Sequence, residues 1–114
     1  MKKRQKTAFG DFLVCLIKQA EMSQEEFYTA VGIAKPYFYD MLISSPPSTE
    51  IQNKMISLFN QKLGFDLERT AAFYDLAAAG RKEIPADIAK LIVDNPEKMK
   101  EVRSGLANIL RTSK

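Results

Sequence analysis

The side chains that most often perform catalysis are scarce in this chain of 114 residues. It contains no His, so the usual general base and the commonest zinc ligand are both missing. Glu25 and Glu26 are neighbours that do not share a helix face, and the five Gly are too scattered to form a phosphate loop. The only Cys, Cys15, cannot form an internal disulfide, and we expect it to be a small buried residue of the first helix. We therefore expect no catalytic residue, no metal site and no cofactor, and a function other than catalysis.

Positive charge is concentrated at the amino terminus. Four of the 17 Lys and Arg residues lie within residues 1–6, whereas the chain from Thr7 onward carries 13 basic and 14 acidic residues. Residues 1–6 are therefore predicted to form a basic arm, in which Lys3 and Arg4 contact DNA phosphates in a strongly salt-dependent manner. The alternative on charge alone is a solvated terminus.

Apolar residues recur at helical spacing along almost the whole chain, and no segment alternates as a strand does. The expected fold class is all-α, with about seven short helices. The first five are predicted at 8–21, 24–31, 35–43, 48–63 and 67–79, with Gly80 following the fifth. Two more are expected between 85 and 112, the first with Pro85 at its first position, N1.

The most informative stretch runs from Ser23 to Leu42. Ser23 is typical of a residue that caps the start of a helix, with Glu26 three residues later completing a capping box. Gly32 provides the tight turn that ends this helix, and Pro36 suits the first turn of the next one. Two short helices joined by a turn containing Gly have the arrangement of a helix-turn-helix motif, whose second helix enters the DNA major groove.

Two stretches of the sequence carry a family resemblance. Ser23-Gln-Glu-Glu-Phe27, Gly32-Ile33 and Tyr37-Phe-Tyr-Asp-Met41 resemble the lambda-repressor-like (XRE) family of helix-turn-helix regulators. The segment from Phe73 to Glu97 is similar to the carboxy-terminal part of many bacterial and prophage members. The resemblance implies a five-helix DNA-binding domain at 7–80 and a two-helix extension at 81–114. It also implies a cytoplasmic regulator, usually dimeric, that binds double-stranded operator DNA and in many cases represses transcription.

The resemblance also implies which residues contact DNA. Gln24 begins the second helix, and Ala34, Lys35, Pro36 and Tyr39 occupy the exposed start of the third. Lys35 is expected to reach a guanine edge or a phosphate, and Tyr39 to contact a thymine methyl group or a phosphate.

A second function remains open at this stage. Tyr28 stands where the family most often has Ala, Pro36 replaces a polar side chain that could read bases, and residues 7–64 carry four basic against six acidic residues. These features favour a helix-turn-helix fold used as a protein-binding module, such as an antitoxin or an inhibitor.

Each of the last two helices has an apolar stripe, and a small five-helix domain could bury both stripes only through a large interface. They are expected either to pack back on the fifth helix or to pair with a second copy, and dimerisation suits a palindromic operator. The predicted dimer contacts are Leu106, Ile109 and Leu110. No apolar run approaches the roughly 18 residues that span a bilayer, so no membrane partner is expected.

Overall fold

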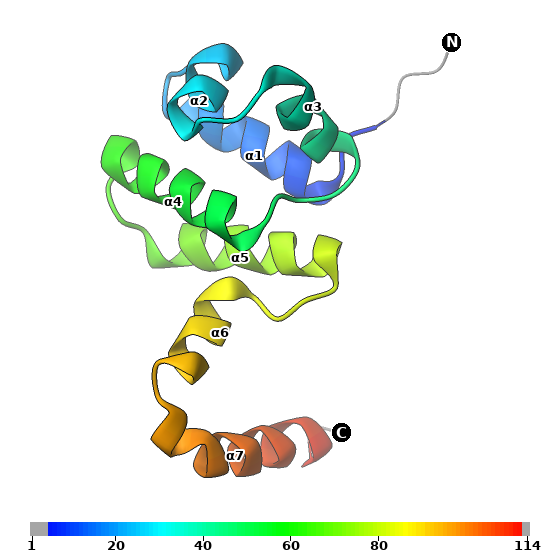
Figure 1. Ribbon diagram of the computed structural model, residues 1–114, viewed down its shortest axis with the longest axis vertical. Coiled ribbons are helices and arrows are strands. Elements are labelled where there is room, and N and C mark those ends of the chain that lie inside the picture. The colour runs from blue at the N-terminus through cyan, green and yellow to red at the C-terminus, as the bar shows by residue number, and fades with distance from the viewer. Residues whose placement is uncertain (1–4, 113–114) are drawn as a thin grey trace.

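The computed structural model describes residues 5–112, and all regular secondary structure in that range is helical (Figure 1). The all-α expectation is therefore confirmed. The seven α-helices and one short 3₁₀ helix (η1) are α1 (Ala8–Gln19), α2 (Gln24–Val31), α3 (Lys35–Ile43), α4 (Thr49–Leu63), α5 (Leu67–Arg81), α6 (Ala86–Val93), η1 (Pro96–Lys98) and α7 (Met99–Thr112).

Short polar side chains begin three of these helices. The Ser23 hydroxyl accepts the Glu26 N–H at 3.0 Å, while the Glu26 carboxylate accepts the Ser23 N–H at 2.8 Å, so the predicted capping box is confirmed. Asp66 accepts the Arg69 N–H at the start of α5. Thr7 does the same for Gly10 at the start of α1. Each such cap stabilises its helix by about 1 kcal/mol.

Two predicted helix ends are confirmed by their backbone conformation. Gly32 after α2 and Gly64 after α4 have φ angles of 88° and 82°, which glycine adopts without steric cost. The end of the first helix differs from the prediction, because α1 stops at Gln19 and Glu21 takes a left-handed conformation outside the helix.

Gly80 does not have the predicted role of following the fifth helix. It lies inside α5, which continues to Arg81 and is ended by Lys82 at a φ of 58°. A β-carbon on Gly80 would lie 2.7 Å from the ring of Pro46, so the glycine permits close packing of α5 on the loop after α3. Pro85 likewise precedes α6 at its N-cap position instead of standing at N1.

Helices α1 to α5 enclose one core that contains five buried phenylalanines. The Phe27 ring stacks on Phe59 with centroids 5.2 Å apart and lies 6.0 Å from Phe38, which joins α2, α3 and α4. Phe9 and Phe73 join α1 to α5 at 5.3 Å. Burying each such ring stabilises the fold by about 1.5–3 kcal/mol.

Cys15 is exposed, which corrects the expectation that it is buried. Leu13, Leu16 and Ile17 of the same helix are buried. Successive residues of an α-helix are about 100° apart, so Cys15 lies nearly opposite Leu13.

Helices α6 and α7 lie at the lower end of the molecule in Figure 1, and Ala86 at the start of α6 packs against this core. Helix α6 packs against α5, and η1 connects it to α7. No side chain from Ala79 to Arg111 is buried. The five-helix body is thus followed by a helical extension that has no core of its own.

Candidate nucleic-acid interface

Helices α2 and α3 are joined by the three-residue turn Gly32–Ala34. Backbone N–H groups of Gly32 and Ile33 both donate to the Tyr28 carbonyl at 3.0 Å, which closes the end of α2. Phe27 and Phe38 are completely buried beneath the two helices. The turn and the shared core therefore fix the angle at which α3 leaves α2.

Tyr28 fills space between these helices. Its half-buried ring lies 5.4 Å from the Phe38 ring at an interplanar angle of 44°. The sequence alone left open how the chain accommodates a Tyr at this position. In the structure, the ring packs on Phe38 and partly covers it.

Four predicted contact residues share the amino-terminal half of α3 and its cap. Ala34, Lys35, Pro36 and Tyr39 are all exposed. Lys35 and Tyr39 are four residues apart and so lie on neighbouring parts of one helix face. The Tyr39 ring meets the Phe38 ring edge-on, with ring centroids 5.2 Å apart. This contact anchors Tyr39 on the core while 41% of the residue stays accessible.

Gln24 occupies a different position from these four residues. It is the first residue of α2 and is half-buried. Among the described residues, no hydrogen bond connects its side chain to α3. The structure therefore brings Ala34, Lys35, Pro36 and Tyr39 together but leaves Gln24 on the neighbouring helix.

The start of α3 has a local electrostatic character that suits an anion. Ala34 offers no side-chain cap, and the first turn contains no acidic residue. The partial positive charge of the helix amino terminus is therefore not neutralised by the chain, and Lys35 adds a full positive charge.

Two exposed residues of α3 were not predicted as contacts. Asp40 lies four residues after Pro36, so both lie on one side of the helix, and its negative charge opposes a close phosphate. Tyr37 is 40% accessible. Helical spacing from Pro36 would have identified Asp40 as part of the same side of the helix.

Thr7, the residue after the predicted basic arm, is bonded to the last turn of α3. The Thr7 N–H donates to the Leu42 carbonyl at 2.9 Å, and the Thr7 hydroxyl donates to the same oxygen at 3.4 Å. Lys6, directly before Thr7, is exposed. Lys3 and Arg4 lie outside the described residues, so their predicted contacts stay predictions.

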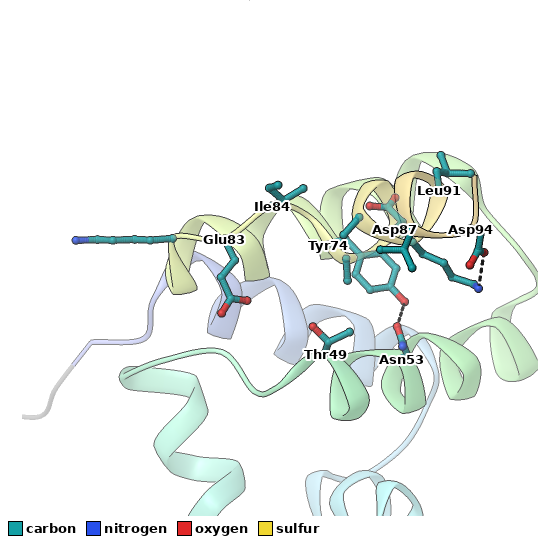
Figure 2. Close-up of a pocket in the computed structure, with 13 residues that line it drawn as sticks. Thr49, Asn53, Tyr74, Glu83, Ile84, Asp87, Leu91 and Asp94 are labelled. Carbon is teal, nitrogen blue, oxygen red and sulfur yellow. Dashed lines mark hydrogen bonds and ion pairs between the residues drawn. The ribbon is translucent and has the colours of Figure 1, made fainter. Parts of the chain in front are cut away.

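A separate groove of about 1000 Å³ lies between α4, α5 and α6 (Figure 2). Across it the Tyr74 hydroxyl donates to the Asn53 side-chain oxygen at 2.6 Å. Burial raises the pKa of Tyr74, and the nearby negative charge of Asp87 raises it further. This groove was not predicted, because it forms only where α6 packs against α5 beside Thr49 and Asn53 of α4, an arrangement that helical periodicity does not specify.

Residues 5–112 contain no group of side chains that could hold a metal ion, and no helix among them is long and apolar enough to cross a membrane. The predicted dimer contacts Leu106, Ile109 and Leu110 are exposed on α7.

No protein-family model, curated protein sequence or solved structure matches this chain. The resemblance to lambda-repressor-like regulators therefore remains a prediction from the sequence.

Proposed function

We propose that this chain is a sequence-specific DNA-binding regulator that acts in the cytoplasm, a transcriptional repressor of prophage or mobile-element type with a lambda-repressor-like helix-turn-helix domain. The observation that carries the proposal is the exposed start of α3. Its polar and aromatic side chains project from a short helix whose angle is fixed by a three-residue turn and a buried aromatic core.

In this proposal α3 enters the major groove with its amino-terminal half foremost. Lys35 donates to a guanine edge or a phosphate, and Tyr39 contacts a thymine methyl group or a phosphate. Between Lys35 and Tyr39, the side chains of Ala34 and Pro36 make close apolar contact with the DNA. Gln24, at the start of α2, contacts the neighbouring sugar-phosphate backbone of the DNA.

The arm supplies the sequence-independent part of the affinity. Because Thr7 is bonded to the last turn of α3, an arm that starts there is well placed to follow the phosphates next to the groove. Each phosphate that Lys3 or Arg4 neutralises releases condensed counterions.

Repression then follows from occupancy of a promoter. A homodimer presents two copies of α3 to a palindromic operator whose half-sites lie roughly 34 Å apart, one helical turn of DNA. The predicted contacts of that dimer are Leu106, Ile109 and Leu110.

The experiment that tests this proposal is selection of bound sequences from random double-stranded DNA at moderate salt, with the purified full chain. Enrichment of one motif, arranged as an inverted repeat, is the expected result. A folded protein that enriches no motif would contradict the proposal.

A specific observation favours a second candidate, a protein-binding module of antitoxin or inhibitor type. Tyr37 and Tyr39 are both about 40% accessible, and exposed tyrosines are enriched at protein interfaces. The two candidates respond differently to salt. DNA binding should weaken steeply between low and moderate salt, whereas an apolar protein interface should change little.

A further inference from the structure

Exposed apolar residues are concentrated in the carboxy-terminal extension. Of the eleven large apolar residues exposed in the described part of the chain, seven lie between positions 84 and 110: Ile84, Ile88, Leu91, Val93, Leu106, Ile109 and Leu110. Exposed apolar residues concentrated in one part of a protein mark an interaction surface.

Helix α7 provides one half of this surface. Leu106, Ile109 and Leu110 are 46%, 64% and 71% accessible, and the half-buried Met99 and Val102 continue the same stripe. Arg103 lies three residues before Leu106, so it flanks the stripe. It takes part in none of the ion pairs found within residues 5–112. The helix therefore presents an apolar stripe with an uncompensated positive charge at its edge.

The groove between α4, α5 and α6 is partly apolar and carries a small excess of negative charge, with three carboxylates against Lys82 and Lys90. Ile84, Leu91 and Val93 give it an exposed apolar lining. Of its carboxylates, Glu83 pairs with Arg81 at 3.0 Å and Asp94 pairs with Lys90 at 2.7 Å.

Asp87 differs from these two carboxylates because it makes none of the ion pairs within residues 5–112. It is half-buried, and its side chain accepts the N–H of Ile88 at 2.9 Å. Figure 2 shows Asp87 above Tyr74, inside the lining of the groove. Asp87 is therefore the carboxylate of the groove that is available to pair with a cation on an incoming surface.

We propose that the occupant of this groove is helix α7 of a second copy of the chain, exchanged reciprocally in a twofold dimer. The stripe of Leu106, Ile109 and Leu110 lies on the apolar lining, and Arg103 pairs with Asp87 of the partner subunit. Reciprocal exchange uses both complementary surfaces of each copy and leaves neither exposed, so the assembly closes at two subunits.

The shape of the chain favours a partner over closure within one copy. Helix α7 lies at the opposite end of the extension from α5 and follows η1 directly (Figure 1). None of residues 99–111 of α7 lines the groove. The proposal refines the dimer on which the proposed function relies, but it is tested without DNA.

Charge reversal tests the pairing. In sedimentation equilibrium of the full chain, Arg103→Asp and Asp87→Arg should each weaken dimerisation by roughly tenfold or more, because attraction becomes repulsion. The double variant Arg103→Asp/Asp87→Arg should restore it. Arg111→Asp is the matched control, since Arg111 lies half a turn round α7 from Val102 and should leave dimerisation unchanged. Equal dimerisation by all four variants would overturn the proposal.

Disulfide trapping tests the arrangement. In a Cys15→Ser background, Leu91→Cys and Ile109→Cys variants are prepared separately, mixed and oxidised. The expected result is a covalent dimer, twice 12.9 kDa, in the mixture but not in either variant alone. A covalent dimer from Ile109→Cys alone would show α7 pairing with α7, which overturns the proposal.

A chain that carries both Leu91→Cys and Ile109→Cys shows whether α7 instead occupies the groove of its own copy. A disulfide formed inside that chain, without a covalent dimer, would also overturn the proposal. Failure of the two proposals can be told apart as well. A monomer that still selects a DNA motif contradicts only the exchanged dimer, whereas a trapped dimer that selects no motif contradicts only the proposed function.

Discussion

The backbone carbonyl of Leu42 lies so close to Gly10 that a β-carbon on Gly10 would be 2.2 Å from the Leu42 oxygen. The same oxygen accepts the N–H of Thr7 at 2.9 Å. The start of α1 and the end of α3 are therefore in backbone contact. This contact fixes the orientation of α3 and the point from which the arm leaves the domain.

Substitution of Gly10 should destabilise the fold. Gly10→Ala forces the backbones of α1 and α3 apart, and overpacking of this kind typically lowers the free energy of unfolding by about 1–3 kcal/mol. Urea unfolding followed by circular dichroism measures the change. The control is Gly105→Ala, because Gly105 is also helical but nothing lies within 4 Å of its added β-carbon. That change should raise the unfolding free energy by up to about 1 kcal/mol. Equal stability of Gly10→Ala and wild type would contradict the contact.

The arm should affect affinity without affecting sequence preference. Lys3→Ala/Arg4→Ala removes two charges that the proposed function assigns to phosphates, so binding should weaken to a similar degree on selected and scrambled DNA. The slope of log affinity against log salt should become shallower by about one for each phosphate that the arm no longer neutralises. Fluorescence anisotropy over a salt series measures both quantities. A changed sequence preference, or an unchanged slope, would count against phosphate binding by the arm.

Tyr74 should make stability sensitive to alkaline pH. Because burial and then Asp87 raise its pKa above the ordinary value of 10.0, the folded chain retains a proton that the unfolded chain releases. Stability from this group is thus fully present below pH 10 and declines as the pH rises from there toward the folded-state pKa.

Asp87→Asn removes the smaller of the two causes. It should move the pKa of Tyr74 back toward 10.0 without reaching it, because burial remains. Tyrosinate absorbance during a pH titration measures the shift, with Tyr74→Phe identifying which part of the absorbance belongs to Tyr74. If the pKa of Tyr74 lay farther above 10.0 in Asp87→Asn than in wild type, the role of the Asp87 charge would be contradicted.

The local features of the fold were predictable from the sequence because they depend on neighbouring residues. The Ser23–Glu26 capping box and the left-handed turn at Gly32 each involve residues within one helical turn. The helical periodicity of apolar residues likewise identified the all-α class. Features that depend on distant residues were missed. Gly80 resembles a helix end in its local sequence, and only the approach of Pro46 explains its place inside α5.

The candidate sites divide in the same way. The exposed residues at the start of α3 follow from helical spacing, so Lys35 and Tyr39 could be identified from the sequence. The groove beside Tyr74 could not be, since its hydrogen bond joins α5 to Asn53 of α4.

The measurement that tests the central claim most directly is sequence selection repeated with Lys35→Ala. If Lys35 reads a base, the variant should bind the wild-type site with about 1–3 kcal/mol less binding free energy, and its sequence preference should relax at one position of each half-site. Lys54→Ala is the control, because Lys54 is an exposed lysine of α4 and its replacement should leave the motif unchanged. An unaltered motif and affinity for Lys35→Ala would contradict base reading by α3.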